Sequence, residues 1–134
     1  MLIAGFGCRR GAPLQALLAL LEQGLEGRPL AALGGLASIA HKRREPALLQ
    51  LAHHLGLPLA IYSAAELAAF DGQLTHRSAL GLLHTGCAGV AESAALAHCQ
   101  HLTGRAATLS MPRLANAEAT LALAAPLPTT EAFS

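Results

Sequence analysis

Short, largely apolar runs that alternate with segments of helical periodicity constrain the fold of this chain more than any other feature. Residues 2–4, 33–39 and 57–62 have the length and composition of buried strands. Leucines at helical spacing follow the first run at 13–24, and a similar pattern follows the second at 46–54. Strands that alternate with helices are typical of an α/β fold in which neighbouring strands are parallel.

The second half of the chain contains fewer helices between its strands. Residues 63–66 match a capping box that would open a short helix, and 90–101 predict a longer one. Between them, residues 71–89 show no regular pattern. Two late strands are predicted at 106–110 and 119–124, and with no helix between them they should pair antiparallel.

We therefore predict a three-layer α/β/α sandwich with a mixed, mostly parallel sheet of about five strands. Residues 1–126 should form a single domain, and 127–134 a loose C-terminal tail. Alanine and leucine supply 58 of the 134 residues and only 3% are aromatic. This composition argues against an all-β sandwich and against a module that stacks single-stranded nucleic acid on aromatic rings.

Charge, hydropathy and cysteine usage indicate which partners and which cellular compartment to expect. The net charge is only +1, so the chain lacks the excess of basic residues that binds duplex nucleic acid, and no nucleic-acid partner is expected. The apolar stretch 46–65 is broken by prolines and a glycine, and residues 1–7 lack the basic start of a secretory signal. Cys8, Cys87 and Cys99 form no CxxC pair, and reduced thiols are typical of a cytoplasm. We expect a cytoplasmic protein with no membrane partner.

A glycine-rich segment with two arginines is the first candidate site. Residues 5–11 read GFGCRRG and are predicted to form a loop between the first strand and the first helix. Backbone N–H groups at such a point attract anions, and guanidinium groups bind carboxylate or phosphate. Gly7, Cys8, Arg9 and Arg10 are therefore candidate ligand-binding residues.

A second basic segment, Lys42-Arg43-Arg44, follows the second predicted strand. Ligands in open α/β sheets bind beyond the carboxyl ends of the strands, so both basic segments should lie at one edge of the sheet. Lys42 is a candidate for binding an anion there. Ser38, at the end of the strand, is either a hydroxyl donor to the ligand or a small residue required by packing.

A second loop rich in small residues, 85–92 (TGCAGVAE), leads into the predicted helix at 90–101. Thr85 and Gly86 are candidates for contact with a ligand. Glu92 has two interpretations. It complements the positive end of the helix dipole, or it is a catalytic acid or base in a pocket.

Two other kinds of site have less support. His98, Cys99 and His101 share a helix end, but no further pair of residues has metal-ligand spacing, and no metal is expected. The glycines of residues 5–11 partly resemble a dinucleotide fingerprint, but the second strand ends in basic residues where an acidic one would bind ribose. A module that binds a nucleotide phosphate, such as that of NADPH, is kept as an alternative.

Four motifs in order resemble those of one known family. They are GFGCRRG at 5–11, LASIAHK at 36–42 followed by Glu45, TGCAGVAESAAL at 85–96, and ATLALA at 119–124. With these motifs the chain resembles the CobE/CbiG C-terminal domain family of cobalamin biosynthesis. The resemblance covers nearly the whole chain. It implies an α/β domain that acts in the corrin-ring pathway, and Arg113 stands about where the family often has a lysine.

The resemblance implies a precorrin-type tetrapyrrole intermediate as the ligand, bound by an accessory enzyme or a carrier. Its acetate and propionate groups need separated cations, and its ring needs an apolar surface. In longer family members the whole protein opens a lactone ring on a cobalt-precorrin, so a hydrolase using Glu92 or a histidine is an alternative. No cofactor is expected, and other enzymes of the pathway are candidate partners. The predicted ligand-binding residues are Gly7, Cys8, Arg9, Arg10, Ser38, Lys42, Thr85, Gly86 and Arg113.

Overall fold

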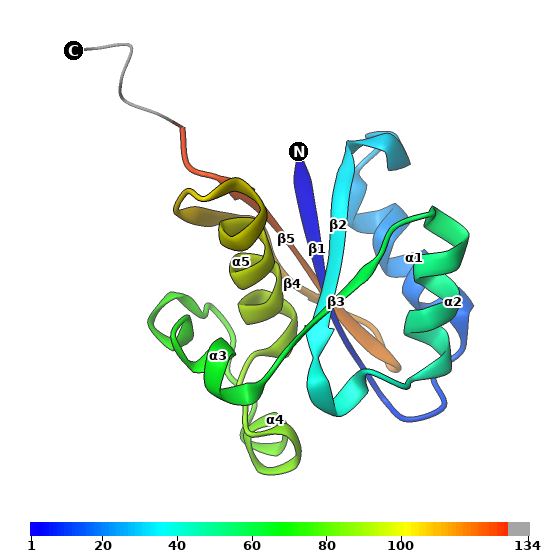
Figure 1. The fold of residues 1–134 in the computed structure, drawn as a ribbon. Coiled ribbons are helices and arrows are strands. Elements are labelled where there is room, and N and C mark those ends of the chain that lie inside the picture. The colour runs from blue at the N-terminus through cyan, green and yellow to red at the C-terminus, as the bar shows by residue number, and fades with distance from the viewer. Residues whose placement is uncertain (129–134) are drawn as a thin grey trace, which may run out of the picture.

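Helices cover both faces of a five-stranded sheet in the computed structural model, which describes residues 1–128 (Figure 1). The strands are β1 (Leu2–Cys8), β2 (Leu33–Ile39), β3 (Leu59–Tyr62), β4 (Ala107–Ala115) and β5 (Ala119–Pro126). The α-helices are α1 (Leu14–Leu25), α2 (Pro46–Leu55), α3 (Ala64–Ala68), α4 (Ala79–Thr85) and α5 (Val90–Thr103). Short 3₁₀ helices are η1 (Leu30–Ala32), η2 (Ala40–Lys42) and η3 (Asp71–Gln73).

The sheet is mixed, as the sequence predicts. Its strand order is β3-β2-β1-β5-β4, with β1, β2 and β3 paired in parallel. β5 is antiparallel to β1, and β4 is antiparallel to β5. Four of the five strands therefore point the same way, and the predicted antiparallel pair is formed by β4 and β5.

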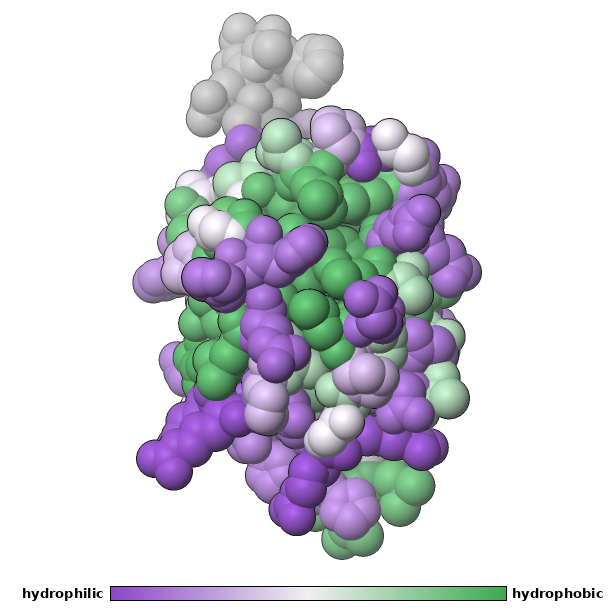
Figure 2. Space-filling view, turned by 90° about the vertical axis from the view of Figure 1, so that its right-hand side faces the viewer, coloured by the Kyte–Doolittle hydropathy of each residue, from purple (hydrophilic) through white to green (hydrophobic). Residues whose placement is uncertain are grey.

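The two faces of the sheet use different side chains for their cores. α1 and α2 cover one face over a cluster that is mainly leucine. Figure 2 shows hydrophobic residues over much of the centre of this side, with hydrophilic residues beside and partly across them. α3 and α5 cover the other face, where the cluster is mainly alanine. In α5 every residue from Ala91 to Cys99 is buried, because this helix is packed on several sides. Alanines allow α5 to approach the sheet closely.

Gly5 is the point of closest approach between α5 and the sheet. A Cβ added at Gly5 would lie 2.1 Å from the carbonyl oxygen of Ala91 and 2.6 Å from the backbone nitrogen of Ala95. The glycine is required by this helix–strand contact. The prediction that β1 ends at Ala4 is therefore wrong, since β1 continues through Gly5 and Gly7 to Cys8 and the loop begins only afterwards.

The segment predicted to be irregular, residues 71–89, contains η3 and the short helix α4. The Ser78 hydroxyl caps α4 by accepting from the N–H of Gly81, a local motif hidden among the small residues there. The predicted capping box at Ser63 and Glu66 is confirmed, with both hydrogen bonds formed. β4 is longer than predicted, because it continues past Ser110 through Pro112 with two register shifts.

The C-terminal tail lies mostly outside the described residues. Of the predicted tail 127–134, the structure describes only Leu127 and Pro128. Leu127 donates its N–H to the carbonyl oxygen of Ala106 at 2.9 Å, and its own carbonyl accepts from Arg105. This first residue of the predicted tail is therefore bonded to the domain.

Candidate ligand-binding site

A cavity of about 400 Å³ opens where β1 and β2 end, and we call it the main cavity. Its lining comes from the ends of both strands, the start of α5, the β4–β5 hairpin and the segment 76–89. The carboxyl ends of parallel strands are where ligands bind in open α/β sheets. A cavity of this volume falls in the range of small-molecule sites.

The main cavity brings together seven of the ten predicted site residues. They are Gly7, Cys8, Arg9, Lys42, Thr85, Glu92 and Arg113. The other three, Arg10, Ser38 and Gly86, lie outside its lining. Residues from four distant parts of the sequence thus meet at the edge of the sheet where both basic segments are expected.

The three residues outside the lining have other roles or surroundings. Ser38 is fully buried and its hydroxyl donates to the carbonyl oxygen of Phe6 at 2.7 Å, which links β2 to β1. Gly86 ends α4 in a left-handed conformation with φ of 79°. Arg10 is exposed to solvent. The Ser38 hydroxyl is thus bonded within the sheet.

Cations outnumber anions around the main cavity. Arg9, Lys42, Arg77 and Arg113 line it, against the carboxylates of Glu92 and Glu118. The Lys42 ammonium group lies 3.7 Å from the Glu45 carboxylate, which is buried beside the cavity. These four cations come from four different segments, so they can contact separated anionic groups of one ligand.

Three backbone N–H groups in and just after the glycine-rich segment, those of Arg9, Gly11 and Ala12, are bonded within the protein. Arg9 donates to the carbonyl oxygen of Glu118 at 2.9 Å, and Ala12 donates to that of Arg9 at 3.1 Å. Gly11 donates to the Glu45 carboxylate at 3.0 Å. An anion-binding cradle built from these backbone groups is therefore not what the geometry favours. Of the lining cations, Lys42 is paired with Glu45 and Arg77 donates to the carbonyl oxygen of Asp71 at 2.6 Å. Within residues 1–128 the guanidinium groups of Arg9 and Arg113 form no such bond, so they are the cations most available to a ligand.

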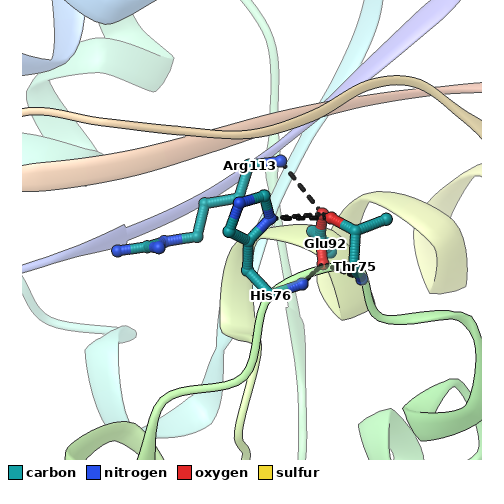
Figure 3. Close-up of polar contacts among 4 residues, drawn as sticks. All are labelled: Thr75, His76, Glu92 and Arg113. Carbon is teal, nitrogen blue, oxygen red and sulfur yellow. Dashed lines mark hydrogen bonds and ion pairs between the residues drawn. The ribbon is translucent and has the colours of Figure 1, made fainter.

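Glu92 is the most fully bonded side chain in the main cavity (Figure 3). Its carboxylate accepts the N–H groups of Thr75 at 2.8 Å, His76 at 3.2 Å and Arg113 at 3.0 Å. It also accepts the Thr75 hydroxyl, and the His76 ring nitrogen Nδ1 lies 3.8 Å away. One buried carboxylate thus connects the start of α5 to the segment before α4 and to β4.

The hydrogen bonds to Glu92 decide its protonation state. Burial alone would raise the pKa of this carboxyl group. The bonds from Thr75, Arg113 and His76 outweigh burial and hold the pKa of Glu92 below its ordinary value of 4.5. A general base is most effective with a pKa near the working pH, so this carboxylate is poorly suited to that role.

A register shift in β4 produces the bond from Arg113. Met111 pairs with Leu123 and Leu114 pairs with Leu121, so β4 has an extra residue between these pairs. The bulge leaves the N–H of Arg113 free of the ladder, and it points to Glu92. The Arg113 guanidinium extends away from Glu92 (Figure 3). Glu92 therefore fixes the backbone from which this cation projects.

Cys8 lines the cavity as a thiol. Burial raises its pKa from 9.0 to about 11, and the nearby Lys42 offsets only part of that effect. Nucleophilic cysteines need a lowered pKa, so Cys8 has the character of a packing residue.

Sequence analysis missed several lining residues. His76 and Arg77 lie in the segment predicted to be irregular, and residues 116–118 form the β4–β5 turn. A cluster of polar side chains, Thr75-His76-Arg77, in an otherwise apolar chain is the signal that could have identified the first group. Neither group follows a predicted strand directly.

Residues 1–128 contain neither a metal-binding cluster nor a helix that could span a membrane. In this part of the chain no group of three His, Cys, Asp or Glu side chains is placed to hold a metal ion. None of the helices described there is long and apolar enough to cross a membrane.

Known proteins resemble the chain over nearly its whole length. The family model described as Cobalamin synthesis G C-terminus matches residues 2–124. The chain belongs to the CobE/CbiG C-terminal family. Protein CobE from Sinorhizobium sp is 39% identical over 127 residues, which cover 93% of this chain and 80% of that protein. This family takes part in cobalamin biosynthesis, and the predicted resemblance is confirmed.

A longer relative matches only in part. Cobalt-precorrin-5A hydrolase from Salmonella typhimurium (strain LT2) is 38% identical over 71 residues, which cover 52% of this chain and 20% of the hydrolase. Most of the hydrolase therefore has no counterpart in the aligned region.

Solved structures of the family confirm the fold. A crystal structure of CobE, a protein from the cobalamin biosynthetic pathway, has a TM-score of 0.90 at 46% identity, covering 95% of this chain and 91% of that one. The cobalamin biosynthesis protein chiG from Agrobacterium tumefaciens str. C58 has a TM-score of 0.66 at 29% identity, covering 96% of this chain and 100% of that one. The α/β prediction is confirmed, and the chain is a cobalamin biosynthesis protein.

Proposed function

We propose that the main cavity binds a polycarboxylated, precorrin-type tetrapyrrole intermediate, and that the protein acts on the pathway as an accessory enzyme or carrier. The observation that supports this most strongly is the set of four cations, Arg9, Lys42, Arg77 and Arg113, brought together from separate segments. Acetate and propionate groups around a tetrapyrrole are separated anions of matching chemistry. Ile39, Leu80, Val90 and Ala91 supply apolar contact for the ring.

The two alternatives are less well supported by the geometry. A lactone hydrolase needs Glu92 or a histidine as a base for water. The Glu92 carboxylate is occupied by four donors and its pKa is lowered. The histidine that lines the cavity, His76, has its ring Nδ1 2.7 Å from the Thr75 hydroxyl oxygen. A nucleotide-phosphate module needs free N–H groups in the glycine-rich segment, and those of Arg9 and Gly11 are bonded internally. The carrier or accessory role requires neither feature.

Neighbouring arginines provide a direct test. The probe is cobyrinic acid, a coloured corrin whose peripheral side chains end in carboxylates, titrated into the purified protein and followed by absorbance. Arg9→Ala should weaken binding roughly tenfold, because it removes one charge-assisted contact. Arg10→Ala is the matched control, since Arg10 is also exposed but lies outside the cavity lining. Equal dissociation constants for both variants and the original protein would remove Arg9 from the site.

Ionic strength should control the affinity. The cations of the main cavity are partly exposed, so their attraction to ligand carboxylates is screened over about 10 Å at 0.1 M salt. Affinity for cobyrinic acid should fall steadily from low to high sodium chloride. An affinity that does not change with salt would mean that apolar contact with the ring, and not the carboxylates, determines binding.

A further inference from the structure

A second cavity of about 430 Å³ adjoins the main one, and we call it the side cavity. The two cavities share Ile39, at the end of β2, and Thr85, at the end of α4. The side cavity is lined by three basic side chains, His41, Arg43 and Arg44, and by the start of α3. The cations predicted together at residues 42–44 are thus divided between two adjoining cavities.

The backbone turn from Ala40 to Glu45 explains this division. η2 covers Ala40–Lys42, and the N–H groups of Arg43 and Glu45 donate to the carbonyl oxygens of Ala40 and Lys42, three residues before them. In a 3₁₀ helix side chains three residues apart lie above one another, while consecutive side chains point in different directions. Lys42 lies on the side of Glu45, its partner three residues on, and lines the main cavity. Ala40 with Arg43, and His41 with Arg44, lie on the remaining sides and line the side cavity.

Arg43 and Arg44 have no internal role that would account for them. Both are exposed, and within residues 1–128 neither forms an ion pair or a side-chain hydrogen bond. Lys42, by contrast, is already paired with a buried carboxylate. Two unpaired guanidinium groups beside a cavity favour an anionic ligand over a structural explanation.

The two cavities lie along one edge of the sheet. The side cavity lies at the ends of β2 and β3, and the main cavity extends from β1 to the β4–β5 hairpin. Five strands spaced about 4.8 Å apart span about 19 Å, a width suited to one large macrocycle with peripheral side chains. A tetrapyrrole is larger than the main cavity can enclose, so part of it must extend beyond that cavity.

We propose that the side cavity is a second carboxylate subsite for the same tetrapyrrole. Arg43 and Arg44 bind acetate or propionate groups at one end of the macrocycle, while Arg9, Arg77 and Arg113 bind those at the other. Ile39 and Thr85 then lie beneath the ring between the two subsites. This inference rests on the proposed function, and it adds which residues bind the carboxylates at each end of the macrocycle.

The test combines protein variants with ligand variants. The dicyano forms of cobyrinic acid and of cobinamide share a corrin ring, but the side chains of cobinamide end in amides. With cobyrinic acid, the double variant Arg43→Gln/Arg44→Gln should bind at least tenfold more weakly than the original protein. With cobinamide, the two proteins should bind alike. Arg28→Gln is the control, because Arg28 lies at the end of α1 and lines neither cavity.

The outcomes separate the two proposals. If Arg9→Ala weakens binding of cobyrinic acid but the double variant behaves like Arg28→Gln, the subsite is wrong and the main cavity stands. If the double variant binds both ligands more weakly by the same factor, the subsite is also wrong, since the effect would not depend on carboxylates. If the original protein binds neither corrin, the proposed function fails together with the subsite. Unchanged circular dichroism of the double variant controls for folding, as both arginines are exposed.

Discussion

Replacing Glu92 by glutamine is expected to lower the free energy of unfolding by about 2–4 kcal/mol, because charge-assisted hydrogen bonds are lost in a buried place. Glutamine has the same shape, but its amide nitrogen is a donor and would face the N–H of Arg113 or Thr75. A buried donor would then lack an acceptor. The measurement is urea denaturation of both proteins at neutral pH. Glu22→Gln is the control, because Glu22 is exposed on α1 and should be nearly neutral.

The effect of Glu92→Gln should also depend on pH in a defined direction. The pKa of Glu92 in the folded protein is below its ordinary value of 4.5, so the unfolded chain takes up its proton first as the pH falls. The stability that Glu92 contributes is complete above that ordinary value and is lost as the pH falls through the lowered pKa. The difference between the two proteins should therefore shrink in acid. A difference that is constant with pH would show that packing, and not charge, is responsible.

Turnover separates the structural and catalytic interpretations of Glu92. If Glu92 acts as a positioning residue, Glu92→Gln should weaken the binding of cobyrinic acid through Arg113 and His76, whose backbone it holds. If Glu92 is instead a general base, Glu92→Gln should lower turnover of a lactone-bearing precursor by roughly a hundredfold, measured as released acetaldehyde, while binding is nearly unchanged. The bonding geometry leads us to expect the first result.

The sequence predicts the fold correctly where an element is defined by its own residues and those next to it. The strand at 33–39 and the helix that follows it at 46 have clear patterns and simple boundaries, and the structure reproduces both. The sequence does not predict how far β1 extends. Gly5 and Gly7 look like loop residues, but each is explained by a neighbour distant in sequence. A Cβ at Gly5 would meet the backbone of α5, and a Cβ at Gly7 would lie 2.8 Å from the Thr120 hydroxyl oxygen of β5.

The candidate site can likewise be predicted from the sequence only in part. The edge of the sheet and four lining residues, Gly7, Cys8, Arg9 and Lys42, follow from the rule that ligands bind where parallel strands end. Thr85 and Glu92 were predicted from the second loop of small residues, and Arg113 from the family resemblance alone. The role of Glu92 does not follow from the sequence, because its donors come from Thr75, His76 and a bulge at Arg113 that no single-sequence pattern reveals. The use of Ser38 in linking two strands depends equally on a neighbour distant in sequence.

Gly5→Ala is expected to lower the free energy of unfolding by at least about 3 kcal/mol, because the added methyl group would meet backbone atoms that cannot rotate away. Urea denaturation should show a large drop in the midpoint with little change in slope. Gly72→Ala is the matched control, since a Cβ at Gly72 meets nothing within 4 Å and its φ is not in the left-handed region. A Gly5→Ala midpoint equal to that of the control would contradict the close packing of α5 on β1.

Gly5→Ala should also weaken ligand binding in any fraction that remains folded. The atom nearest to the added methyl group is the carbonyl oxygen of Ala91, and Ala91 itself lines the main cavity next to Glu92. Relieving the clash requires α5 to move away from β1, which displaces Glu92 from its donors in β4 and before α4. Arg113 and His76 then lose the group that positions their backbone. The absence of a side chain at Gly5 thus determines where the start of α5, and with it one wall of the candidate site, can lie.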